Sequence, residues 1–143
     1  MDFKNFISPS SKQELIFDGE SLISKSGENF NIQNSIPRFV TSENYSAAFG
    51  IQWNKFQKTQ LDSYTKKNIT EKRLQTAIGM PLTELKGKKI LEAGSGAGRF
   101  TEILLKYGAH VYSFDYSGAV EANFINNMPN KDLTIFQADI REI

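Results

Sequence analysis

The sequence predicts an α/β fold with a parallel sheet, and three features of residues 88–143 support this prediction. A short apolar strand over residues 88–93 runs into a glycine-rich turn, residues 94–98, and this turn opens a helix. A second strand over residues 110–115 ends on a carboxylate, and a third follows over residues 133–137. Strands that alternate with helices are typical of βαβ units, whose strands lie parallel.

Residues 1–40 predict a flexible tail followed by a small β-rich module. Residues 1–14 are polar and contain Ser and Pro, so we expect them to be loose. Beyond them, short apolar runs alternate with turn residues; Asp18-Gly19 predicts a hairpin and Gly27 a second turn. The chain has no cysteine, so the module must fold without a disulfide or a zinc–thiolate site. A module of this size cannot build an adequate core alone, and we expect it to pack against the main domain.

Residues 41–80 predict helices. Ser42, Glu43 and Asn44 can begin a helix that extends to about residue 60. A second helix is predicted over residues 70–78, and Gly79-Met80-Pro81 would end it. Helical spacing places an aromatic side on the first helix, formed by Tyr45, Phe49, Trp53 and Phe56. Such a stripe is also typical of ordinary core packing.

Two further helices are predicted between the three strands. The helix after the glycine turn ends at Gly108, and its apolar face contains Phe100, Ile103, Leu104 and Tyr107. Ser117 can cap the next helix, which extends to about Asn127 because Pro129 cannot continue it.

The glycine turn and Asp115 together predict a nucleoside site. Glycines let the backbone come close to a ligand, and a carboxylate that ends the next strand can accept hydrogen bonds from two ribose hydroxyls. A dinucleotide-binding turn reads G-x-G-x-x-G, whereas these glycines alternate as G-x-G-x-G, which argues against the alternative of an NAD(P)-binding protein. The alternative without a ligand is an ordinary strand–helix turn, with Asp115 forming a turn before Tyr116 and Ser117.

Two stretches resemble class I S-adenosylmethionine (SAM) methyltransferases. The run Glu92-Ala93-Gly94-Ser95-Gly96-Ala97-Gly98 matches the first motif of that family, (D/E)-x-G-x-G-x-G, at every defined position. The stretch from Ile36-Pro37-Arg38-Phe39-Val40 through Phe49-Gly50 and Gln52-Trp53 to Thr59-Gln60-Leu61-Asp62-Ser63 is similar to the opening of many bacterial members. In those relatives the N-terminal module often resembles a zinc ribbon with Cys-x-x-Cys pairs, which this chain lacks.

The resemblance implies a Rossmann-like methyltransferase core, of which this chain is the N-terminal portion. Residues 81–143 would form its SAM-binding half, with the first three of the family's usual seven strands, and residues 41–80 a helical lid. The first strand would be central in the complete sheet, so its free edge is expected to be long and apolar. Such an edge pairs with other chains, which predicts self-association through the first strand.

The resemblance also implies which residues hold the cofactor. Glu92 would orient the ammonium of SAM, or alternatively act as a charge near the helix N-terminus. Asp115 would bind the ribose, and Asp139 would accept the N–H of the adenine amine unless it only caps a loop. Tyr116 would pack on the adenine or belong to the core. The full expected set is Glu92, Ala93, Gly94, Ser95, Gly96, Gly98, Asp115, Tyr116, Asp139 and Ile140, with Tyr45 and Trp53 closing over it.

The implied function is methyl transfer from SAM to a small-molecule acceptor. The residues that would align an acceptor are not among the matched motifs, so no catalytic residue is assigned. The alternative is a non-catalytic SAM-binding or scaffolding module that pairs through its open sheet edge. A formal net charge of +1 gives no case for nucleic-acid or membrane binding, and one histidine cannot make a metal site. The absence of a signal pattern at the N-terminus predicts a cytoplasmic protein.

Overall fold

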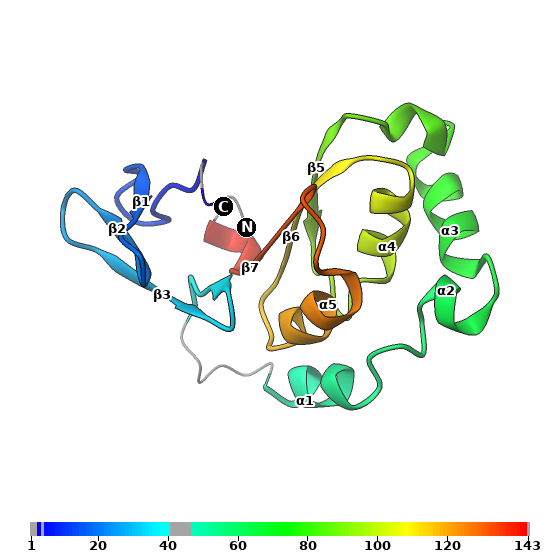
Figure 1. The fold of residues 1–143 in the computed structure, drawn as a ribbon, viewed down its shortest axis with the longest axis horizontal. Coiled ribbons are helices and arrows are strands. Elements are labelled where there is room, and N and C mark those ends of the chain that lie inside the picture. Colours follow the sequence, from blue (N-terminus) through cyan, green and yellow to red (C-terminus); the bar gives the residue numbers. More distant parts are fainter. Residues whose placement is uncertain (1–2, 4, 41–46, 143) are drawn as a thin grey trace.

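The computed structural model describes residues 3, 5–40 and 47–142, and it contains two separate β-sheets (Figure 1). The first sheet is antiparallel, with the strand order β1-β2-β3-β4, and the second is parallel, with the order β5-β6-β7. The mixed α/β fold and the parallel sheet are therefore confirmed. The strands are β1 (Leu15–Phe17), β2 (Ser21–Ser24), β3 (Asn29–Gln33), β4 (Ile36–Pro37), β5 (Lys89–Ala93), β6 (His110–Asp115) and β7 (Leu133–Gln137).

The antiparallel module forms its turns where the glycines predict them. Oδ1 of Asp18 accepts hydrogen bonds from the backbone N–H groups of Glu20 and Ser21, at 2.9 and 2.8 Å, in the hairpin between β1 and β2. Gly19 in that hairpin has a φ of +111°, and Gly27 between β2 and β3 has a φ of +89°. Glycine adopts these angles without strain, so the local sequence decides both turns.

The expectation that residues 1–14 are loose differs from the structure. Among the described residues of this stretch, Ser8 is fully buried, and its N–H donates to the carbonyl of Gln13 at 2.8 Å. The hydroxyls of Ser11, Ser10 and Ser8 donate to the Glu28 carboxylate, and these bonds lower its pKa to about 2. Contacts between segments this far apart in sequence leave no local pattern that could have revealed them.

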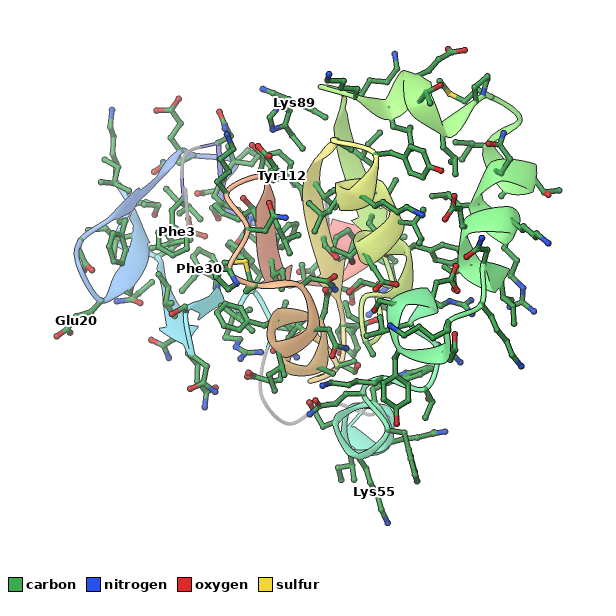
Figure 2. All side chains as sticks on the ribbon, turned by 45° about the vertical axis from the view of Figure 1, so that its right-hand side comes forward. Phe3, Glu20, Phe30, Lys55, Lys89 and Tyr112 are labelled. Atoms are coloured by element: carbon green, nitrogen blue, oxygen red, sulfur yellow. The ribbon has the colours of Figure 1, made fainter. Side chains whose placement is uncertain are left out.

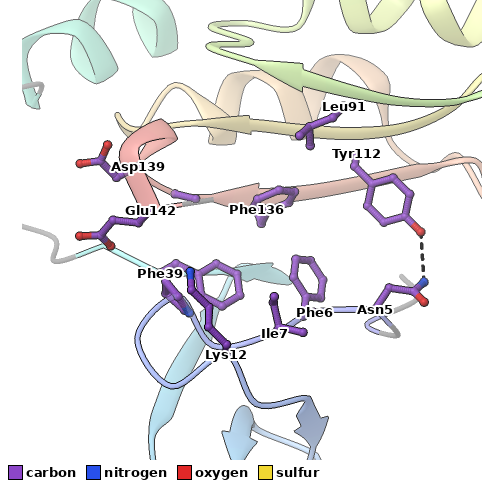
Figure 3. A pocket seen from close by; sticks show the side chains of 12 residues that line it. Asn5, Phe6, Ile7, Lys12, Phe39, Leu91, Tyr112, Phe136, Asp139 and Glu142 are labelled. Carbon is purple, nitrogen blue, oxygen red and sulfur yellow. Dashed lines mark hydrogen bonds between the residues drawn. The ribbon is translucent and has the colours of Figure 1, made fainter.

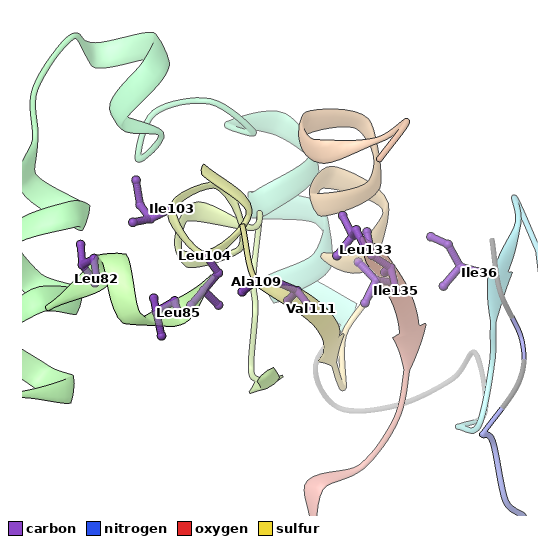
Figure 4. Close-up of a cluster of buried hydrophobic side chains, with 10 residues drawn as sticks. Ile36, Leu82, Leu85, Ile103, Leu104, Ala109, Val111, Leu133 and Ile135 are labelled. Atoms are coloured by element: carbon purple, nitrogen blue, oxygen red, sulfur yellow. The ribbon is translucent and has the colours of Figure 1, made fainter. Parts of the chain in front are cut away.

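The main core lies between one face of the parallel sheet and the helices α4 (Arg99–Lys106) and α5 (Val120–Asn127) (Figures 1 and 4). The strands are parallel with Val111 opposite Leu133 and Ile90, so alternate residues of each strand point to this face. Its buried members are Ile36, Leu82, Leu85, Ile103, Leu104, Ala109, Val111, Val120, Leu133 and Ile135.

The opposite face of the parallel sheet is turned toward the N-terminal module. Tyr112 of β6, labelled in Figure 2, lies on this side, where its hydroxyl accepts a hydrogen bond from Nδ2 of Asn5 at 3.3 Å (Figure 3). Phe6 and Phe39 pack against Phe136 of β7, with ring centroids 5.2 and 6.1 Å apart. A cavity of about 220 Å³ lies between the sheet and the N-terminal segment, and Figure 3 shows its aromatic walls. The aromatic contacts supply the packing against the main domain that the small module needs.

Arg38 fixes the module to the outer edge of β7. Its Nη1 donates to Oε1 of Gln137 at 3.0 Å, and its guanidinium forms an ion pair with Glu121 of α5. The backbone N–H of Phe39 donates to the carbonyl of Gln137 at 2.8 Å, so the chain runs alongside β7 at this point.

Three helices connect the two sheets: α1 (Ala47–Lys55), α2 (Asp62–Thr65) and α3 (Ile69–Ile78). The helix predicted over 43–60 is therefore shorter, and its expected start at Ser42 lies outside the described residues. Asp62 instead caps α3, because its carboxylate accepts hydrogen bonds from the N–H groups of Thr70 and Glu71 at 3.0 and 2.9 Å. Short 3₁₀ turns span Leu82–Leu85 and Ile140–Glu142.

The outer edge of β5 is unpaired among the described residues. The sheet ends at this strand, and Leu91 in its centre is 55% exposed. Lys89 and Ala93 are exposed as well. No helix within the described ranges is both long and apolar enough to cross a membrane.

Candidate functional site

The glycine turn follows β5 at the carboxyl edge of the parallel sheet and leads into α4. The N–H groups of Gly94 and Ser95 both donate to the carbonyl of Phe114, at 2.9 and 3.0 Å, so the turn folds back over the end of β6. Gly94, Gly96 and Gly98 have φ angles of +75°, +54° and +83°. Each of the alternating glycines therefore occupies a backbone region that other residues rarely adopt.

The surroundings of Gly94 and Gly98 differ sharply. A Cβ at Gly98 would lie 2.1 Å from Oδ1 of Asn123 and 2.4 Å from Nδ2 of Asn127, so Gly98 is needed for close packing against α5. A Cβ at Gly94 would meet no atom within 4 Å. The turn therefore has open space beside Gly94, whereas Gly98 is packed tightly against α5.

Asp115, the expected ribose ligand, holds the shape of the turn. Its Oδ2 accepts a hydrogen bond from the N–H of Gly96 at 2.9 Å. Its Oδ1 accepts bonds from the N–H and the hydroxyl of Ser117, at 2.8 and 2.7 Å. A carboxylate accepts about four hydrogen bonds, so roughly one position remains. Two ribose hydroxyls can bind only if the Ser117 hydroxyl rotates away. One ribose hydroxyl would then take the place of the Ser117 hydroxyl as a donor to Asp115.

Glu92, near the end of β5 just before the turn, belongs to a buried polar network. Its Oε2 accepts hydrogen bonds from the hydroxyls of Thr101 and Ser113, and Nδ2 of Asn123 donates to both of these hydroxyls at 3.0 and 2.9 Å. Burial raises the pKa of the Glu92 carboxyl, and the hydroxyl bonds offset part of that rise. Its second oxygen, Oε1, is buried and has no partner among the described residues.

Trp53 of α1 lies over the turn. The nearest atom of its indole ring is 3.6 Å from the place where a Cβ of Gly96 would be, which is ordinary van der Waals distance, so the ring lies close to this glycine. The sequence places Tyr45 beside Trp53 in the expected lid, but Tyr45 lies outside the described residues. The structure thus brings one of the two expected lid residues to the glycine turn.

The residues after β7 are arranged differently from the expectation. Arg141 donates to both oxygens of the Asp139 carboxylate, with Nε at 3.0 and 3.1 Å, and this bonding lowers the pKa of Asp139. An adenine amine would therefore compete with a guanidinium. Ile140 is 67% exposed, so it forms no wall in the described structure. The carbonyl of Tyr116 accepts a bond from Gln137, which ties the end of β6 to β7.

Buried polar atoms without a partner gather around the glycine turn. Among the described residues, only four such side-chain atoms occur, and three of them belong to Glu92, Ser95 and Asn126. The fourth is Nε of Arg38 in the module interface. An unsatisfied buried polar atom costs about 1–3 kcal/mol, and such atoms are often explained by a ligand or an ordered water. The residues at the turn therefore fit a polar ligand that offers them both donors and acceptors.

The asparagines of α5 are functional candidates that the sequence analysis missed. Asn127 donates to the carbonyl of Gly98 at 3.1 Å, and Asn126 donates to the carbonyl of Ala97 at 2.9 Å. Positions 123, 126 and 127 are spaced i, i+3, i+4, which places their side chains on one helix face. That spacing in the helix after Asp115 is the signal that could have revealed them.

Neither comparison with known proteins identifies the chain by similarity. No protein-family model matches it, and no curated protein matches it. Within the described residues, no group of His, Asp and Glu side chains is arranged to hold a metal ion. The features of the chain that bear on its function are the glycine turn and its neighbours.

Proposed function

We propose that this chain binds SAM at the glycine turn and forms the cofactor-binding part of a methyltransferase that acts on a small molecule. The observation that carries the proposal is the turn itself, which follows Glu92 at the carboxyl edge of a parallel sheet and is bonded by Asp115 through the N–H of Gly96. The sequence resemblance to the first methyltransferase motif selects SAM among nucleosides. The strand order β5-β6-β7 agrees with the first three strands of a Rossmann-like sheet.

The residues of this site would hold SAM by its polar groups. Asp115 would accept hydrogen bonds from ribose hydroxyls, with Ser117 releasing one acceptor position. The space in front of Gly94 lets the ligand approach the backbone, and the indole of Trp53 covers the turn. SAM supplies a methyl group on a sulfonium, which is a good leaving group, so an enzyme of this kind mainly aligns an acceptor with that methyl.

Titration calorimetry with SAM and with S-adenosylhomocysteine tests the proposal. We expect binding by the wild-type chain and a loss of about 1.5–3 kcal/mol of binding free energy in Asp115→Ala, because charge-assisted hydrogen bonds disappear. The matched control is Asp132→Ala, which removes a carboxylate that pairs with His110 at 2.9 Å before β7 begins. The control should bind as the wild type does.

The same titration separates the proposal from its competitors. Unchanged SAM affinity in Asp115→Ala would contradict the assigned ribose contact. Binding of NADH in place of SAM would favour a dinucleotide-binding protein. SAM binding without methyl transfer to any acceptor would favour the non-catalytic module, a reading that the unpaired β5 edge supports.

A further inference from the structure

Asn126 lies at the junction of three parts of the molecule. It belongs to α5, and its side-chain Nδ2 donates two hydrogen bonds, one to the carbonyl of Ala97 at 2.9 Å and one to the carbonyl of Gln57 at 3.0 Å. Ala97 is part of the glycine turn, and Gln57 follows the end of α1. The two hydrogens of the Asn126 amide thus connect the end of α1 with the glycine turn.

Other contacts hold α1 over the same edge of the sheet. A Cβ at Gly50 would lie 3.0 Å from the backbone nitrogen of Gly118, so α1 approaches the start of α5 closely. Asn54 donates to the carbonyl of Gly118 at 3.0 Å. These contacts attach α1 to the start of α5. Asn127 bonds the turn at the carbonyl of Gly98, and among the described residues Asn126 is the one whose side chain bonds both the turn and the segment after α1. Figure 1 shows α1 at the bottom of the view, below α5.

We propose that Asn126 is a positioning residue, which fixes α1 and the glycine turn relative to each other and thereby keeps Trp53 closed over the ligand. The identity of the ligand in this inference rests on the proposed function. The coupling between α1 and the turn is independent of that function. Without the Asn126 amide, the carbonyls of Ala97 and Gln57 lose their common donor. Trp53 then loses its fixed distance to Gly96, and SAM loses the cover that excludes water.

Trp53 reports this coupling directly, because it is the only tryptophan of the chain. The test compares wild type with Asn126→Ala by tryptophan emission and by calorimetric titration with SAM. Asn68→Ala is the matched control, since Asn68 is exposed and its side chain makes no capping bond. Ile135→Val is the control for stability, since it removes one methylene from the buried core without touching the turn.

We expect Trp53 emission to move to longer wavelength in Asn126→Ala, and SAM affinity to fall about tenfold, as the loss of two hydrogen bonds implies. Asn68→Ala should change neither quantity, and neither should Ile135→Val, even at an equal loss of Tm. Wild-type emission together with wild-type SAM affinity in folded Asn126→Ala would overturn the inference and leave the proposed function intact. If the wild-type chain binds no SAM, the proposed function fails. The emission of Asn126→Ala then decides the coupling alone.

Discussion

Glu92 is an ionisable residue whose protonation the fold controls. Burial raises its pKa above the ordinary 4.5, so the folded chain binds a proton more readily than the unfolded chain does. Between the unfolded and the raised folded pKa, the folded state therefore carries more bound protons. The contribution of Glu92 to stability is complete below the unfolded pKa and is lost as pH rises through the folded pKa.

The direction of this pH dependence predicts how the stability of Glu92→Gln should change with pH. The variant removes a titrating group, so its free energy of unfolding should decline less than that of wild type as pH rises from about 4.5 toward neutrality. Each unit of raised pKa corresponds to about 1.4 kcal/mol at the upper end of this range. Urea denaturation of both proteins at several pH values measures this difference in the free energy of unfolding. A steeper decline in Glu92→Gln than in wild type would contradict the burial of this charge.

Glu28, whose pKa is lowered to about 2, affects stability in a separate pH range. Its contribution to the free energy of unfolding is lost as pH falls below 4.5.

Gly94 offers a second prediction at the scale of one residue. In Gly94→Ala the added methyl meets no atom within 4 Å. The free energy of unfolding should therefore fall only by the strain of alanine at a positive φ, about 1 kcal/mol. The same methyl would enter the space that SAM needs, and SAM affinity should fall by more than this strain explains. Thermal unfolding and calorimetric titration of the variant separate the two effects.

Gly98→Ala is the contrasting variant to Gly94→Ala. Its methyl would lie 2.1 Å from Oδ1 of Asn123, and we expect it to destabilise the fold itself. Equal stability of the two alanine variants would show that the turn is arranged differently, and unchanged SAM affinity in Gly94→Ala would place the ligand elsewhere.

At the scale of elements, local pattern was sufficient wherever a segment is decided by its own residues. The strands over 110–115 and 133–137 have the bounds that the sequence predicts, since each is an apolar run between turn residues. The hairpin at Asp18-Gly19 and the turn at 94–98 also follow from residues that tolerate a positive φ. The helix over 43–60 was predicted too long, since α1 ends at Lys55 and turn residues follow over 56–60 before α2 begins at Asp62.

The candidate site divides in the same way. Its turn and Asp115 could be found, because their chemistry depends on residue type and spacing. The polar network of Glu92, Thr101, Ser113 and Asn123 could not, because hydroxyl and amide side chains are ordinarily exposed. Only packing of α4 and α5 on the sheet buries them together. The pairing of Arg141 with Asp139 was missed, because Asp139 was assigned to the adenine amine or to a loop cap and Arg141 reads as a solvated surface charge.

At the scale of the whole molecule, the parallel sheet has one covered edge and one open edge. The module covers β7 through Arg38 and Phe39, whereas β5 exposes its backbone and Leu91. An unpaired strand of this kind offers its N–H and C=O groups to another strand. Pairing of two copies along β5 would bury Leu91 and extend each sheet, so the protein should form dimers or larger species as concentration rises.

A charge on the open edge should prevent this association. In Leu91→Lys, pairing along β5 would bring two ammonium groups together and would desolvate them, and lysine protects natural edge strands in this way. We expect sedimentation velocity to show association of the wild type with rising concentration and a monomer for Leu91→Lys. Ile125→Lys is the control, because Ile125 is 57% exposed but lies on α5, away from the edge. It should associate as the wild type does. A wild-type chain that stays monomeric at high concentration would show that the β5 edge is protected, by its twist or by the flanking charges of Lys88 and Lys89, and that the scaffolding alternative lacks its interface.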